Sequence, residues 1–268
     1  MNLTKGIFKT VFQQRSLIWQ LARYKLREQY AATLLGSFWA VLQPLMTILV
    51  FWFVFSYGLK LQSPNANEIP FFLILFCGLV PWMTFSEGLS AGTQSILAHQ
   101  YLVKKIVFPL EILPIVQIVA SLVVHLYLIG FLFLILIFYG IWPSLYSIQI
   151  LYYIFAMAFL TTGLSWLLSA LNVFHRDVGQ SLNLIIMLWF WITPIVWPAK
   201  NLSGWALKIV EANPLYYIIE GYRSTFLYAE PFWHNPNMGV YFWTVSISMF
   251  IIGITFFRRV KNQFSDVL

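Results

Sequence analysis

The sequence predicts an all-α polytopic membrane protein with six transmembrane helices, an N-terminal amphipathic interfacial helix and short re-entrant helices before the sixth span. Of the 268 residues, 60% are hydrophobic and only 9% are charged, whereas soluble domains are about half apolar and about a quarter charged. Six apolar segments exceed the ~18 residues that mark a membrane span. They are continuously apolar rather than alternating, so they are helices and not strands of a barrel. Six spans leave little chain for a soluble catalytic domain.

Residues 1–35 are predicted to form a cytoplasmic amphipathic helix that lies at the membrane surface. The segment holds six lysine and arginine residues and one acid, Glu28. Leu17, Leu21 and Tyr24 share one face of a helical wheel, and the cations beside them would lie near lipid headgroups. A solvated basic leader is the alternative.

Residues 36–268 form the predicted transmembrane domain. Clusters of Asn, Pro, Gly and Ser separate its apolar segments, notably SPNAN at 63–67 and GIWPS at 140–144. The six spans are expected at about residues 37–59, 70–91, 111–141, 148–171, 181–199 and 239–257.

The distribution of lysine and arginine predicts how these spans are oriented. If both termini are cytoplasmic, twelve of the sixteen Lys and Arg residues lie on the cytoplasmic side and four lie outside, as the positive-inside rule requires. The expected location is the cell membrane. Much of the net charge of +7 is then a topology signal, so nucleic-acid binding is not expected.

Two cytoplasmic loops have the composition of docking elements for another protein. Residues 97–109 (LAHQYLVKKIVFP) predict a short helix that ends at Pro109, with apolar residues beside its cations, and NVFHRDVG at 172–179 predicts a tight turn. A positive-inside anchor is the alternative for the first loop. The candidate docking residues are His99, Lys104, Lys105, Arg176 and Asp177.

The connection between the fifth and sixth spans is too apolar for a loop in water. Residues 205–228 are strongly apolar and aromatic, yet Asn213 and Pro214 interrupt them. We expect two short helices within about 203–228 that dip back into the outer leaflet, where surrounding protein shields them. An aromatic-rich interfacial loop is the alternative.

Two spans carry stripes that mix aromatic, amide and thioether side chains. Rings can stack on the apolar faces of sugars, and an amide can exchange hydrogen bonds with hydroxyls, so the stripes are candidates for a substrate path. Helix packing or a homodimer seam is the alternative. The candidate path residues are Trp39, Gln43, Met46, Phe53 and Tyr57 in the first span and Asn183, Met187, Phe190 and Trp191 in the fifth.

The chain lacks the sequence motifs of an energy-converting site. It has no GxxxxGK[ST] phosphate loop, no HExxH and no CxxC, and its four histidines are scattered, so neither nucleotide nor metal binding is expected. Ion-coupled carriers place ionisable residues near the membrane midplane. Here His125 is either a neutral histidine hydrogen-bonded to a neighbouring helix or a proton relay, and Glu87 is either a packing acid or a coupling site. This scarcity favours an external motor.

Several motifs together resemble the membrane subunit of ABC-2-type exporters of bacterial surface glycopolymers. They are YAATLLGSFWAVLQP at 30–44, KKIVFPLEILP at 104–114, NVFHRDVG at 172–179, ITPIVWP at 192–198 and NPLYYIIEGYR at 213–223. Within that class, VFWFVFSYGL at 50–59 and KNQFSDVL at 261–268 look most like wall teichoic acid exporter permeases. O-antigen exporter permeases are the second choice.

The resemblance implies a transporter built from two copies of this chain and two copies of a separate ATPase, which would bind the ATP and Mg. It implies no catalytic site or cofactor in this chain, a coupling helix in 97–109, and a substrate polymer on undecaprenyl diphosphate. Arg23, Lys25 and Arg27 become candidates for guiding the diphosphate, with generic attraction to anionic lipid as the alternative. The implied outer gate comprises Asn213, Pro214, Tyr217, Glu220 and Arg223.

Three other functions fit part of the sequence. An O-antigen or capsular polysaccharide exporter differs only in its polymer, and a small-lipid or drug exporter of the same superfamily differs mainly in path width. An intramembrane polyprenyl-phosphate transferase would need acidic or histidine groups beside a phosphate clamp. Only His175, Arg176 and Asp177 come near that pattern.

Overall fold

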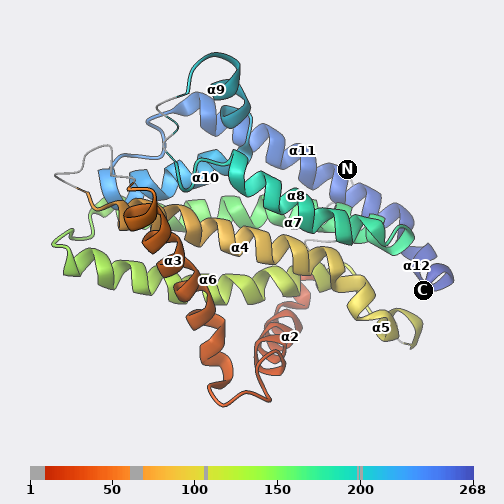
Figure 1. Cartoon of the computed structure of the whole chain (residues 1–268). Helices are drawn as coiled ribbons and strands as arrows, with labels where there is room; N and C mark the ends of the chain where they lie inside the picture. Colours follow the sequence, from red (N-terminus) through yellow and green to blue (C-terminus); the bar gives the residue numbers. More distant parts are fainter. Residues whose placement is uncertain (1–9, 61–68, 106–107, 198, 200–201) are drawn as a thin grey trace.

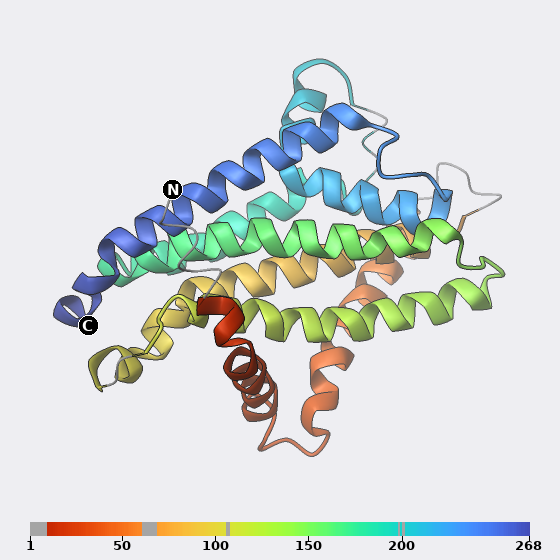
Figure 2. The same cartoon turned by 180° about the vertical axis from the view of Figure 1, so that it is seen from behind.

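The computed structural model describes residues 10–60, 69–105, 108–197, 199 and 202–268. All regular structure in these ranges is helical. Figures 1 and 2 show most helices lying side by side in one bundle, from which α2 and α3 project together on one side. The longer elements are α2 (Arg15–Glu28), α3 (Trp39–Phe53), α4 (Phe71–Ala98), α6 (Ile112–Phe138), α7 (Ile150–Phe174), α8 (Asp177–Ile192), α10 (Pro214–Arg223) and α11 (Pro236–Val260).

Short elements extend or connect these helices. They are η1 (Gly36–Phe38), η2 (Val54–Gly58), α5 (Gln100–Lys105), η3 (Leu145–Gln149), α9 (Gly204–Glu211), η5 (Ser224–Tyr228), η6 (Lys261–Gln263) and α12 (Phe264–Val267).

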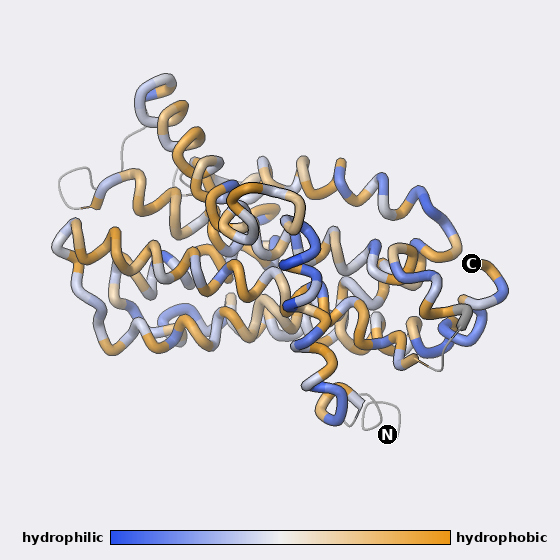
Figure 3. Tube along the Cα trace, turned by 90° about the horizontal axis from the view of Figure 1, so that it is seen from below, coloured by the Kyte–Doolittle hydropathy of each residue, from blue (hydrophilic) through white to orange (hydrophobic). Residues whose placement is uncertain are grey.

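Five helical segments of the described residues are long and apolar enough to cross a membrane. They agree with the first four and the sixth of the predicted spans, and they are Gly36–Gly58, Phe71–Ala98, Ile112–Phe138, Leu145–Phe174 and Pro236–Val267. Figure 3 shows that hydrophilic residues gather in α2 and at the end of the bundle that carries α12, while the rest of the bundle is mostly hydrophobic.

The predicted fifth span, 181–199, is shorter as a helix than expected. α8 ends at Ile192 after 16 residues, which is about 24 Å of helix, and residues 193–197 are not helical. Pro194 disfavours helical backbone at the residue before it, and Thr193 is extended, with φ −82° and ψ 130°. Thr193, Ile195 and Val196 are nevertheless buried, so protein encloses this irregular segment.

α4 is the central helix of the bundle. It packs against α6, α7, α10, α3 and α8, and most of its apolar side chains are buried. By contrast, α3 packs mainly along its α4 and α6 sides and lies obliquely to the bundle (Figure 1). Most of the α3 surface is therefore open.

α7 and α11 cross closely because two glycines face each other. A Cβ atom on Gly253 would lie 2.1 Å from the carbonyl oxygen of Gly163, and one on Gly163 would lie 2.7 Å from Cα of Phe250. Small residues allow such backbone approach between membrane helices.

α2 packs on the bundle through Ile18 and Ala22, and Leu17 and Leu21 of the predicted face pack beside them. Ile18 and Ala22 are buried against Ile112, Val116 and Ala120 of α6. Of the predicted face, Leu17 and Leu21 are only partly buried and Tyr24 is exposed. The small Ala22 and Ala120 let the two helices approach, which a helical wheel of side-chain hydrophobicity does not weigh.

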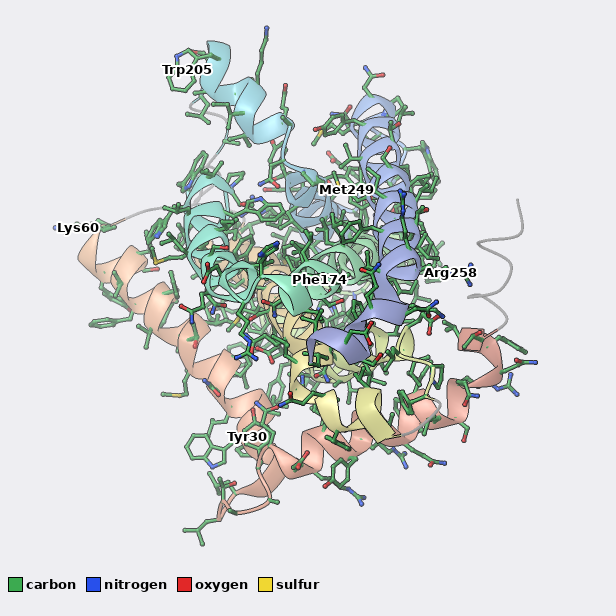
Figure 4. The ribbon with its side chains drawn as sticks, turned by 90° about the vertical axis from the view of Figure 1, so that its right-hand side faces the viewer. Tyr30, Lys60, Phe174, Trp205, Met249 and Arg258 are labelled. Atoms are coloured by element: carbon green, nitrogen blue, oxygen red, sulfur yellow. The ribbon has the colours of Figure 1, made fainter. Side chains whose placement is uncertain are left out.

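The two short helices predicted within 203–228 are present, and they differ in burial. α9 stands apart from the bundle and carries the exposed Trp205 (Figure 4). α10 packs against α4, α7 and α11 and buries most of its residues. Within the helix predicted at 97–109, α4 ends at Ala98 and α5 covers Gln100–Lys105, while residues 106–107 lie outside the described residues.

Candidate functional site

A cavity lined by both polar and apolar residues lies where α2 meets α3, α4 and α6. Its volume is about 290 Å³. α2 and the segment after it contribute Lys25 and Tyr30, and Figure 4 shows Tyr30 at the junction of α2 and α3. The remaining lining residues are Leu26, Gln29, Ala40, Gln43, Pro44, Thr47, Met83, Thr84, Ser86, Glu87, Ala120, Ser121, Val124 and Leu128.

Lys25 is the one member of the predicted diphosphate-guiding group that lines this cavity. Burial lowers the pKa of its ammonium group below the usual value, and the carboxylate of Glu87 partly opposes this shift. Burial and the charge of Glu87 both raise the pKa of Tyr30. Arg23 and Arg27 are exposed, and the guanidinium of Arg23 lies 5.0 Å from the ring centroid of Trp19.

The α3 stripe forms a second, open groove of about 420 Å³. The predicted path residues Trp39, Gln43 and Met46 line it, together with Thr47, Val50 and Phe51. Phe53 and Tyr57 are exposed further along the same helix, with ring centroids 5.7 Å apart. The structure therefore brings part of the predicted stripe into one groove.

The predicted path residues of α8 do not line that groove but lie on a neighbouring surface. Phe190 is in edge contact with Phe51, with centroids 5.4 Å apart, and so joins α8 to α3. Met187 and Trp191 are exposed. Asn183 accepts a 3.2 Å hydrogen bond from Ser90 of α4. Together α3 and α8 present a broad apolar surface.

Asn213 and Pro214, predicted at the outer gate, form the beginning of α10. The Oδ1 atom of Asn213 accepts a hydrogen bond from the Leu215 amide, as an N-cap residue does, and Pro214 takes the first helical position, where proline is favoured. The same Oδ1 accepts from Trp189 Nε1 at 2.9 Å, and Asn213 Nδ2 donates to Thr193 Oγ1 at 2.8 Å. Asn213 thus fastens α10 to the end of α8.

Glu220 and Arg223 form an ion pair with a 2.6 Å contact. Arg223 is buried and also donates through Nη2 to the carbonyl of Ile195 at 2.9 Å. This bond satisfies one carbonyl of the non-helical segment after α8. Tyr217 is buried, and its hydroxyl lies 2.9 Å from that of Tyr152. These residues pack α10 into the bundle.

His125 lies at the centre of a buried chain of hydrogen bonds across three helices. Its Nδ1 is 2.7 Å from Thr84 Oγ1, and its Nε2 is 2.6 Å from the Tyr222 hydroxyl. Thr84 donates to the carbonyl of Val80, so the consistent assignment has Nδ1–H donating to Thr84 and Tyr222 O–H donating to Nε2. This is the arrangement of a neutral histidine hydrogen-bonded to its neighbours.

The predicted docking residues lie at the α12 end of the bundle or beside it. The ring of His99, at the end of α4, donates to the carbonyl of Ser95. Arg176 and Asp177 are exposed at the turn between α7 and α8. Lys104 and Lys105 belong to α5, but their side chains lie outside the described part of the structure.

Asn172 stabilises the turn of the NVFHRDVG motif, a role that the sequence did not predict. It is buried, accepts a 2.8 Å hydrogen bond from the Gly179 amide and donates to the carbonyl of Thr93. Its place at the start of a turn-forming motif was the available signal, since Asn bonds readily to nearby backbone.

The segment GLSAG at 88–92 matches the GxSxG pattern of hydrolases, but its structure is different. That pattern places serine at a sharp turn between strand and helix. Here the residues lie within the continuous helix α4, and Ser90 donates to Asn183. The match carries no hydrolase chemistry.

The described residues form a helical bundle with five helices of membrane-spanning length and apolarity, as in a polytopic membrane protein. The chain belongs to the ABC-2 type transporter family, whose pattern matches residues 16–227.

Two similar proteins are both described as O-antigen export system permease protein RfbA. The one from Klebsiella pneumoniae is 28% identical over 246 residues, which is 91% of each chain. The one from Myxococcus xanthus is 26% identical over 222 residues, which is 82% of this chain and 84% of that protein.

Proposed function

We propose that this chain is the permease subunit of an ATP-driven exporter that moves a lipid-linked surface polysaccharide across the cell membrane. One observation carries the proposal: a cavity that holds Lys25 and Glu87 adjoins a groove lined by Trp39 and Met46. A cation beside the membrane surface suits the phosphate of a lipid carrier. An aromatic groove suits sugars that must slide rather than remain bound.

The polymer proposed is of the O-antigen type. The similar proteins are both named as O-antigen export permeases and match over most of their length. They support this choice over wall teichoic acid, which the sequence motifs placed first and which the comparisons do not support. The polymer would travel on an undecaprenyl diphosphate lipid.

The working transporter is proposed to contain two copies of this chain and two copies of a separate ATPase, with both termini of the chain in the cytoplasm. Pairing with a second copy of the chain is supported by the exposed apolar faces of α3 and α8, which include Met46, Phe53 and Met187. Binding of the ATPase is supported by α5 and the exposed 175–177 turn, two short elements that lie at one end of the bundle.

The proposed cycle is mechanical. ATP closes the two ATPases, their movement is passed to α5, and the two permease subunits separate along α3 and α8. The polymer then passes over aromatic and amide groups that offer many weak contacts. A single deep site would halt it.

The test is complementation of a bacterium that lacks its O-antigen permease and retains the ATPase and polymer synthesis. Expression of this chain with its own ATPase should return polysaccharide to the cell surface, measured by surface labelling, and should clear the intracellular lipid-linked polymer. The proposal is wrong if the polymer stays inside although both proteins reach the membrane and associate. Export of small lipids alone would favour the alternative of a small-lipid or drug exporter with a narrower path.

A further inference from the structure

The lining of the α2–α3–α4–α6 cavity combines polar and apolar groups, as the surface of a sugar does. Gln29 and Gln43 supply amide groups that donate and accept. The hydroxyls of Ser86 and Thr47 donate to carbonyls of their own helices, so their oxygens remain able to accept a hydrogen bond. Sugars combine hydroxyl donors and acceptors with apolar ring faces, and the apolar part of the wall comprises Leu26, Ala40, Pro44, Met83, Ala120, Val124 and Leu128.

Charge in the cavity is confined to one cation and one acid. Lys25 and Glu87 are the only charged residues of its lining, which consists of described residues. The single ammonium group of Lys25 attracts one phosphate group. The carboxylate of Glu87 repels an anion but can accept hydrogen bonds from hydroxyl groups. The ligand that fits both is a neutral polar ring carried beside a phosphate.

The cavity also adjoins the groove of the proposed path. Gln43 and Thr47 line both spaces, so the two meet at these α3 side chains. A group held in the cavity is therefore next to the surface over which the rest of the polymer would move.

From these three observations we infer that the cavity binds the first sugar of the lipid-linked polymer, the one attached to the diphosphate. Lys25 binds the phosphate next to it, and Gln29, Gln43 and Ser86 bind the sugar hydroxyls. This inference rests on the proposed function and adds to it a recognition site for the reducing end of the polymer.

The experiment measures lipid binding to the purified full-length chain in phosphatidylcholine nanodiscs. The probes are undecaprenyl diphosphate with one N-acetylglucosamine, undecaprenyl diphosphate alone, and phosphatidylglycerol. The wild-type chain should bind the glycosylated probe at least about tenfold more tightly than the bare diphosphate, since two or three neutral hydrogen bonds reach this ratio even at the low end of their usual net strength. Phosphatidylglycerol should bind more weakly than either.

The variants separate the sugar contacts from the phosphate contact. Gln43→Leu with Ser86→Ala should reduce the tenfold preference to about twofold or less and leave the affinity for bare diphosphate unchanged. Lys25→Ala should weaken both diphosphate probes about equally. Gln20→Leu, an exposed amide on α2 outside the cavity, is the matched control and should change neither.

The outcomes distinguish this inference from the proposed function. Equal, tight binding of both diphosphate probes to the wild-type chain, or a preference that survives the double variant, overturns the inference and leaves the exporter intact. Diphosphate lipids that bind no better than phosphatidylglycerol overturn both.

Discussion

Lys25 lies in a different environment from Arg23 and Arg27 because of helix geometry. Residues four apart share a face of a helix, whereas residues two apart lie on nearly opposite faces. Arg23 and Arg27 therefore face outward together, and Lys25 faces the cavity. The three cations look equivalent in the sequence, and only the packing of α2 on α6 separates them.

The lowered pKa of Lys25 predicts how lipid binding depends on pH. Only the protonated ammonium attracts phosphate, so binding of undecaprenyl diphosphate should weaken as pH rises through the lowered pKa, below the ordinary value of 10.5. Lys25→Arg should keep its charge and retain binding at high pH. Titration of binding between pH 7 and pH 10 checks this. If the wild-type chain and Lys25→Arg lose binding in parallel as pH rises, Lys25 is not the phosphate contact.

The His125 network predicts a loss of stability when one hydroxyl is removed. Tyr222→Phe leaves His125 Nε2 buried without its donor, and should lower the free energy of unfolding by about 1 kcal/mol. Tyr127→Phe, an exposed residue of α6, is the control. Thermal unfolding in detergent measures both. A melting temperature for Tyr222→Phe equal to that of the control would mean that the network adds nothing to stability.

Among the elements, α7 and α11 depend on backbone contact at Gly163 and Gly253. Gly253→Leu would place side-chain atoms where the Gly163 carbonyl lies, so the helices must separate and the protein should lose a discrete, monodisperse fold. Gly130→Leu is the matched control, because a Cβ at Gly130 meets nothing within 4 Å. Size-exclusion chromatography after mild heating compares them. Equal recovery of both variants would contradict the close-packing account.

The short helix α5 leads to a prediction about the partner. Lys104→Glu with Lys105→Glu should reduce co-purification of the ATPase several-fold, because it reverses charge on the proposed docking helix. Lys60→Glu with Lys208→Glu is the control, since both residues are predicted on the outer side. The amount of ATPase retained on the tagged permease is measured. Retention equal to the control would exclude docking through these lysines.

At the level of elements, the apolar runs predicted five spans well because length and continuous apolarity determine which segments can cross a membrane. They overestimated the fifth, since hydropathy does not register the backbone restriction that Pro194 places on Thr193. The Asn213–Pro214 break was readable as an N-cap followed by a helix-starting proline. The hydrogen bond from Arg223 to the Ile195 carbonyl could not be predicted from the sequence, because it joins residues far apart in the chain.

On the scale of the whole molecule, the candidate site could be predicted only in part. The α3 stripe followed from helical spacing, and Trp39, Gln43 and Met46 do share one groove. The cavity could not be predicted, because it depends on how α2 approaches α6 and on which of three cations faces inward. Local periodicity identifies faces of helices, while tertiary packing decides what each face meets.

The central claim is that polymer crosses the membrane over the α3 groove. The direct measurement is ATP-driven export in vesicles that hold the permease and its ATPase, with variants made in matched pairs. Trp39→Ala and Met46→Ala alter the groove, whereas Trp142→Ala and Leu134→Ala alter residues exposed elsewhere. Export should be at least about fivefold slower for the groove variants at equal membrane levels, with the controls near wild type. Equal export rates in groove and control variants would contradict this claim.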